Sequence, residues 1–86
     1  MRTWTANYDG NQIRIEHSGF FQYGKLFVNN KLQDEKSYVF EPPSLTGHLM
    51  SNDGDRKPVK AHLNGIFIKK CRLFIDDEIV EVTKVS

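Results

Sequence analysis

Dipeptides that favour tight turns recur along the whole chain, and they restrict its possible folds more than any other feature. Asp9-Gly10, Asp53-Gly54 and Asn64-Gly65 are the strongest of these signals, because Asp-Gly and Asn-Gly readily adopt the positive φ angles of a two-residue hairpin turn. Asn29-Asn30 and Asp76-Asp77 are weaker signals of the same kind. Short runs of alternating apolar and polar residues lie between them, which is typical of half-buried strands. The pattern predicts consecutive β-hairpins with little or no helix.

The alternating runs predict about eight strands, over Thr3–Tyr8, Asn11–His17, Lys25–Val28, Leu32–Phe40, Ser44–Met50, Lys57–Leu63, Ile66–Ile75 and Glu78–Val85. In the seventh of these, Ile66 and Ile68 are out of phase with Cys71, and a bulge near Lys69-Lys70 would restore the alignment. The alternation also predicts which residues point inward: Trp4, Ala6, Tyr8, Ile13, Ile15, His17, Leu26, Val28, Val59, Ala61, Leu63, Cys71, Leu73 and Ile75.

The two halves of the sequence resemble each other. The segment KLFVNNKL from Lys25 matches RLFIDDEI from Arg72, and each half contains a hairpin, a connection and a second hairpin. A pair of hairpins cannot bury its apolar face alone, so we expect two copies to pack face to face. The 86 residues leave room for one domain only. The prediction is a single antiparallel β-sandwich over residues 1–86 with pseudo-repeated halves, and a partly closed β-barrel is the alternative.

The first half also resembles the Fas apoptotic inhibitory molecule family. The residues that carry the resemblance are a tryptophan that opens a strand, an Asp-Gly turn, alternating isoleucines before Glu-His, and Gly-Lys before a strand that ends in a turn: Trp4, Asp9-Gly10, Ile13, Ile15, Glu16-His17, Gly24-Lys25 and 27–31. The match covers about the first 31 residues. The resemblance implies a non-enzymatic antiparallel β-sandwich of the cytosol that acts through protein contacts.

No arrangement of residues in the sequence indicates catalysis or metal binding. Cys71 with His17 or His62 is the one combination of nucleophile and base, and Cys71 lies in phase with Leu73 like a small core residue. The histidines, His48 included, lack the close ligand spacing of a zinc site. We therefore expect no enzyme activity, no catalytic residues, no metal and no cofactor.

Two segments are candidates for binding. Gly19 and Gly24 bracket three aromatic residues that would anchor a protein partner if exposed and would belong to the core if the segment caps the sandwich: Phe20, Phe21 and Tyr23. Residues 56–72 contain six basic and no acidic side chains, and alternation places four potential cations on one outer face: Lys60, His62, Lys70 and Arg72.

These segments support two functional hypotheses. The first is a protein-interaction or structural module with an unknown protein partner, including a homodimer formed through a strand edge. The alternative is a module that binds anions or single-stranded nucleic acid through the basic hairpin 56–72. Nucleic acid is the less favoured partner, because the net charge is only +1.

The cellular location follows from what the sequence contains. The single cysteine, Cys71, favours a reducing compartment. The first residues, MRTWTANYDG, do not resemble a secretory signal, and the longest apolar stretch, Ile66–Ile68, is too short to span a bilayer. We expect a cytoplasmic protein that does not enter membranes.

Overall fold

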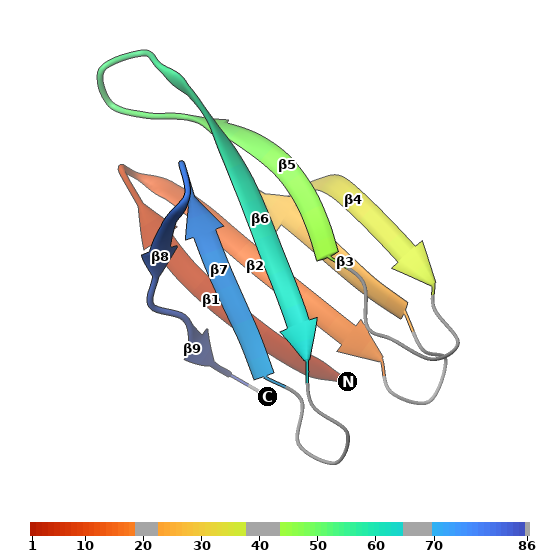
Figure 1. Ribbon diagram of the computed structural model, residues 1–86. Helices are drawn as coiled ribbons and strands as arrows, with labels where there is room; N and C mark the ends of the chain where they lie inside the picture. Colours follow the sequence, from red (N-terminus) through yellow and green to blue (C-terminus); the bar gives the residue numbers. More distant parts are fainter. Residues whose placement is uncertain (19–22, 38–43, 65–69, 86) are drawn as a thin grey trace.

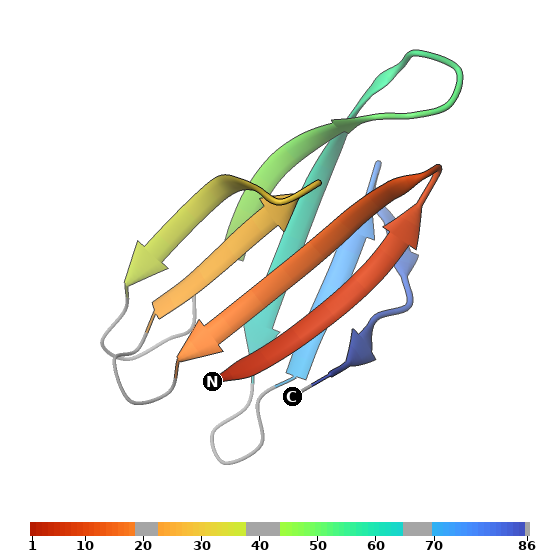
Figure 2. The same cartoon turned by 180° about the vertical axis from the view of Figure 1, so that it is seen from behind.

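Two antiparallel sheets face each other in the computed structural model, which describes residues 1–18, 23–37, 44–64 and 70–85 (Figures 1 and 2). Sheet A has the strand order β4-β3-β2-β1-β9, and sheet B has the order β5-β6-β7-β8. Their bounds are β1 Arg2–Tyr8, β2 Asn11–Ser18, β3 Tyr23–Val28, β4 Lys31–Ser37, β5 Ser44–Met50, β6 Arg56–Asn64, β7 Lys70–Ile75, β8 Glu78–Val80 and β9 Thr83–Lys84. The predicted β-sandwich is confirmed, and the two sheets do not close into a barrel.

Three predicted turns adopt the expected positive φ angles, whereas at Asp53-Gly54 only Gly54 does, with a φ of 86°, in the longer connection between Met50 and Arg56. Asp9 and Gly10 have φ angles of 47° and 77°, and Asn29 and Asn30 have 52° and 66°. Asp76 and Asp77 have φ angles of 54° and 64°, close to those of Asn29 and Asn30. Asn and Asp tolerate this left-handed region better than other residues with a side chain. The hairpin turns lie at the same end of the sandwich, which we call the turn end (Figure 1).

Apart from β9, the two sequence halves form the two sheets. Strands β1 to β4 form a meander in sheet A, and strands β5 to β8 form the equivalent meander in sheet B. Phe27 in β3 and Phe74 in β7 each lie opposite a basic residue of the preceding strand, Arg14 and Lys60 respectively. The predicted pseudo-repeat is therefore present in the fold as two hairpin pairs packed face to face.

The core lies between the sheets and contains the side chains that the alternation predicts to point inward. Ile13, Ile15 and His17 of β2 are completely buried. Tyr8 and Cys71 are only partly buried and pack against the edge of the core. The buried apolar residues are Trp4, Ala6, Ile13, Ile15, Leu26, Val28, Leu45, Leu49, Val59, Ala61, Leu63, Leu73 and Ile75. Leu45 and Leu49 of β5 were not among the predicted inward residues.

The prediction of one strand over Glu78–Val85 is wrong. The chain leaves sheet B after Val80 and pairs beside β1 in sheet A, where the Val85 amide donates a hydrogen bond to the Thr3 carbonyl at 2.9 Å. Val80 and Val82 both pack against the core, so crossing between the sheets keeps both side chains in apolar contact. The predicted bulge near Lys69-Lys70 and residues 38–40 of the fourth predicted strand involve positions outside the described residues.

Replacing Ile15 by valine should lower the free energy of unfolding by about 0.5–1.5 kcal/mol, because a methyl group is removed from a fully buried position. Ile79→Val is the matched control, since Ile79 is 70% exposed and valine is an equally good strand residue. Urea unfolding followed by tryptophan fluorescence measures both variants. Equal effects of the two substitutions would contradict the assignment of Ile15 to the core.

Candidate functional site

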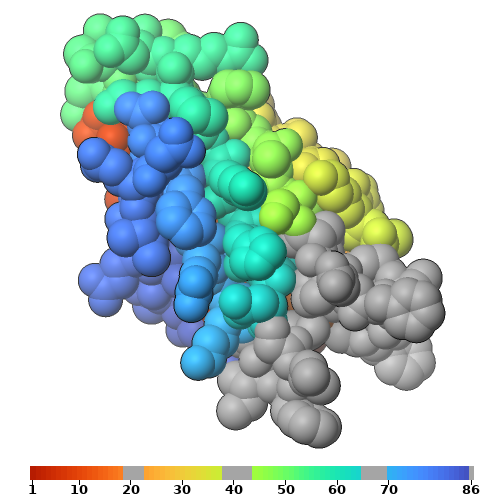
Figure 3. Space-filling model, viewed as in Figure 1, coloured from red at the N-terminus to blue at the C-terminus, as the bar shows by residue number. Residues whose placement is uncertain are grey.

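The outer face of sheet B carries the four potential cations that the sequence placed together. Lys60 and His62 of β6 alternate with the buried Val59, Ala61 and Leu63, and His62 lies directly opposite Arg72 of β7. Lys70 lies opposite Asn64 one row further along. We call Lys60, His62, Lys70 and Arg72 the basic face; β6 and β7 run side by side across the front of Figure 3.

No acidic side chain shares this face within the described strands of sheet B. Neighbouring strands are about 4.8 Å apart, so the four residues lie within roughly one Debye length, about 10 Å, of their nearest neighbours. Among the described residues, Lys60, Lys70 and Arg72 take part in no ion pair. The remaining side chains of the face are Ser44, Thr46, His48, Met50, Arg56, Pro58, Asn64, Phe74 and Ile79.

On the outer face of sheet A, the basic side chains at the positions equivalent to those of sheet B form ion pairs with carboxylates. The Arg14 guanidinium lies 4.2 Å from the centre of the Phe27 ring, and its Nε is 3.1 Å from Glu16 Oε2. Lys25 forms a second ion pair, 3.8 Å from Glu35 Oε1. In the repeat, Glu16 corresponds to His62, because each lies two residues beyond the partner of the equivalent phenylalanine. The half that forms sheet B has a base where sheet A has an acid.

Two apolar side chains that the sequence pattern did not indicate as part of a site adjoin the basic face. Phe74 is half-buried opposite Lys60, and Ile79 lies opposite Phe74 and is 70% exposed. The tight turn at Asp76-Asp77 sets this register, so combining that turn with the alternation of β7 would have placed both side chains on the outer face. His62 is oriented by Ser44, whose Oγ lies 2.9 Å from its Nδ1.

The aromatic segment does not join the basic face as far as the structure describes it. Tyr23 opens β3 in sheet A, where it is half-buried opposite Ser18 and Ser37. The Lys25 ammonium lies 5.2 Å from the centre of its ring. Phe20 and Phe21 lie outside the described residues.

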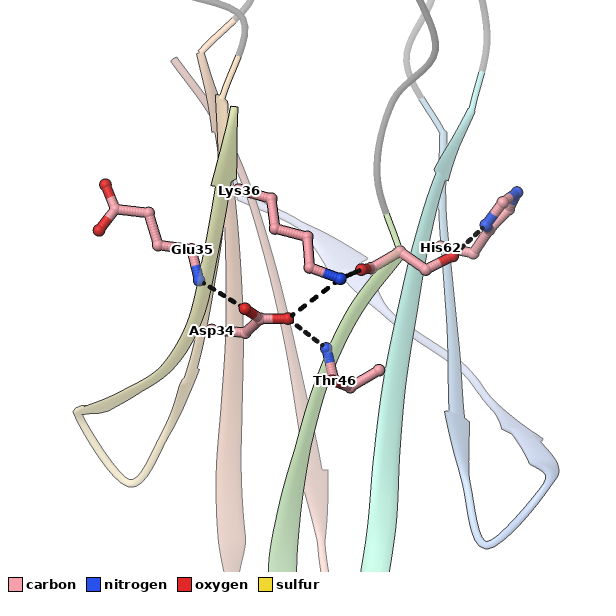
Figure 4. Close-up of polar contacts among 6 residues, drawn as sticks. Asp34, Glu35, Lys36, Thr46 and His62 are labelled. Atoms are coloured by element: carbon pink, nitrogen blue, oxygen red, sulfur yellow. Dashed lines mark hydrogen bonds and ion pairs between the residues drawn. The ribbon is translucent and has the colours of Figure 1, made fainter. Parts of the chain in front are cut away.

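Side chains of β4 cover the free edge of β5 (Figure 4). The Thr46 amide donates a 2.8 Å hydrogen bond to Asp34 Oδ2, and Lys36 Nζ donates a 2.8 Å hydrogen bond to the Ser44 carbonyl. Gly47 makes this approach possible, because a Cβ atom there would lie 2.9 Å from the Cβ of Gln33. The edge of β5 therefore uses side chains in place of a strand partner.

The residues considered for catalysis and metal binding are separated. His17 is buried between the sheets, whereas His62 lies on the outer face of sheet B. Burial raises the pKa of the Cys71 thiol to about 12, which disfavours the reactive thiolate at neutral pH. In the described ranges, no group of three or more His, Cys, Asp or Glu side chains could hold a metal ion.

Replacing Asp34 by alanine should lower the free energy of unfolding by about 1–2 kcal/mol, because the Thr46 amide loses a charged acceptor at a partly exposed site. Glu35→Ala is the matched control: its carboxylate pairs with Lys25 only at the surface, and such pairs contribute about 0–1 kcal/mol. Amide hydrogen exchange at Thr46 should accelerate in the first variant alone. Unchanged exchange at Thr46 would show that Asp34 does not protect the edge.

The stability of the wild-type protein should fall as the pH rises from about 9 to about 12, in part through Cys71. Its thiol has a pKa near 9.0 in the unfolded chain and about 12 in the folded protein, so between these values the unfolded state loses the proton first and is favoured. Cys71→Ala should show a smaller decline over the same range in urea unfolding at a series of pH values. Identical pH profiles for both proteins would contradict the burial of the thiol.

Comparison with known proteins found no matching family model, no significantly similar curated protein and no significantly similar solved structure. Within the described residues there is no helix long and apolar enough to cross a membrane.

Proposed function

We propose that the chain is a non-enzymatic binding module that contacts an acidic protein partner through the basic face. One observation carries the proposal: Lys60, Lys70 and Arg72 share an outer sheet face with His62 and with no carboxylate among the described strand positions. Surface charges of one sign attract a partner of the opposite sign and accelerate its association.

The composition of the face suits contact with a protein. Phe74 and the exposed Ile79 adjoin the cations, and buried apolar or aromatic anchors supply much of the energy of a protein interface. Arg72 offers a planar guanidinium that can hold a carboxylate through two hydrogen bonds. The opposite face of the sandwich has its cations paired with Glu16 and Glu35, so it is the less attractive surface for an acidic partner.

The resemblance to the Fas apoptotic inhibitory molecule family supports a non-enzymatic module that works by protein contacts in the cytoplasm, where Cys71 would stay reduced. A homodimer through a strand edge is part of the same proposal, with one restriction. Addition of a strand to β5 would have to break the hydrogen bond that Asp34 accepts from the Thr46 amide and the one that Lys36 donates to the Ser44 carbonyl. The edges of β4, β8 and β9 are the sites left for pairing.

Single-stranded nucleic acid is a second candidate partner, favoured by the position of Phe74 opposite Lys60. Single-strand binding proteins combine cations with aromatic rings on which bases stack. Phe74 is the one aromatic residue on the described part of this face and is half-buried. A platform for several stacked bases needs more rings, so we rank the acidic protein first.

Fluorescence anisotropy with a labelled oligoglutamate peptide tests the proposal, and a labelled oligothymidine strand of equal length tests the second candidate. We expect oligoglutamate to bind, and to bind more weakly when the salt rises from about 50 to about 200 mM. Lys60→Glu combined with Lys70→Glu should weaken binding at least about tenfold, since two attractive contacts become repulsive.

Lys25→Glu combined with Lys84→Glu is the matched control, because it changes the net charge equally on residues of sheet A. It should weaken binding much less. Tighter binding of oligothymidine than of oligoglutamate would show that single-stranded nucleic acid, and not an acidic protein, is the partner of the basic face. No binding of either probe at low salt, or equal loss in the two double variants, would refute a specific role for the basic face.

A further inference from the structure

A groove of about 280 Å³ lies at the turn end, where the β5–β6 hairpin extends beside the start of β4. Its floor is apolar: Val28 and Leu49 are nearly buried, and Met50 is 56% exposed at the margin. Its volume is near the lower limit for small-molecule sites, which are roughly 300–1,000 Å³ and mostly apolar with a few placed polar groups.

Three basic side chains from three different strands line this groove: Lys31 of β4, His48 of β5 and Arg56 of β6. Arg56 Nη2 lies 3.3 Å from His48 Nδ1, so the guanidinium donates to an imidazole and not to a carboxylate. Neither Lys31 nor Arg56 forms an ion pair within the described part of the chain. Basic groups gathered beside an apolar floor without a counter-charge form a site for an anion.

The opposite wall of the groove is held in place by hydrogen bonds. Asn29 Nδ2 donates to Asn11 Oδ1 at 2.9 Å, and Asn11 Nδ2 donates to the Met50 carbonyl at 2.7 Å. Asn29 Oδ1 also accepts from the Gln12 amide at 2.9 Å. These bonds join the turns of three hairpins, so the groove is formed before any ligand arrives, which reduces the entropy lost on binding.

We propose that this groove binds a small carboxylic acid with a compact hydrophobic body. The carboxylate would bind Arg56 and Lys31, and the body would cover Leu49 and Val28. An inorganic anion would leave the apolar floor exposed to water, whereas an uncharged ligand would leave the cations without a counter-charge. Arg56 and His48 belong to the same outer face of sheet B, but the groove contains none of the four residues of the basic face. The inference therefore does not depend on the proposed partner of that face.

Titration of the isotope-labelled protein with benzoate, followed by proton–nitrogen NMR spectra, tests this inference. A ligand of about ten non-hydrogen atoms should bind with a Kd of roughly 1 mM. We expect saturable shifts at the amides of Lys31, Leu49, Met50 and Arg56. Benzamide, which has the ring without the charge, and acetate, which has the charge without the ring, should each bind at least about tenfold more weakly.

Arg56→Gln and Lys31→Gln should each weaken benzoate binding about three- to tenfold, as expected for the loss of one charge-assisted hydrogen bond at a partly exposed site. Lys70→Gln removes one positive charge from the basic face and should leave benzoate binding unchanged. The spectrum of each variant reports whether the fold is intact. Absence of saturable shifts, shifts centred outside the groove, equal binding of benzamide, or equal loss in Lys70→Gln would overturn the proposal.

Discussion

The contact between the inner faces of the two sheets determines the rest of this structure. Neither meander can bury its apolar side chains alone, and burial contributes about 25 cal/mol per Å² of apolar surface removed from water. Ile15 of sheet A and Leu63 of sheet B point into this layer. Because side chains alternate along each strand, the neighbours of these inward residues must point to the outer face of their sheet. Lys60, His62 and Arg72 therefore point away from the core, on the outer face of sheet B.

The repeat shows how one backbone arrangement supports two different surfaces. Arg14 and Lys60 occupy equivalent positions beside Phe27 and Phe74, and both sheets contribute buried side chains to one core. The outer faces contribute little to that core, so their charges were free to differ. Glu16 and Glu35 pair with cations on the face of sheet A, whereas the position equivalent to Glu16 in sheet B is His62, and the charged groups of that face are all basic among the described strand positions.

Much of the fold could be predicted from the sequence, because turns and alternation act locally. Asn29-Asn30 and Asp76-Asp77 form the expected tight turns, and the inward phase of β2 and β6 follows from their alternation. The division of Glu78–Val85 between two sheets could not be predicted, because it depends on contacts of Val82 with a distant core.

Of the two candidate sites, the basic face could be predicted from the sequence and the groove could not. The shared face of Lys60, His62, Lys70 and Arg72 follows from strand phase, as does their separation from His17. The groove beside Arg56 and Lys31 involves hairpins from both halves of the sequence. Its hydrogen bonds between Asn11, Asn29 and Met50 are tertiary contacts for which the sequence has no local signal.

The side chains of β4 that cover β5 also affect how the molecule behaves in a crowded solution. An uncovered edge is a template on which further chains can assemble, and such growth leads to fibrils. Asp34 and Lys36 occupy hydrogen-bonding groups that an incoming strand would need, and Gly47 lets β4 lie close enough to supply them. A domain with a net charge of only +1 has little electrostatic repulsion between copies. Covering β5 removes one of the edges through which such copies would otherwise associate.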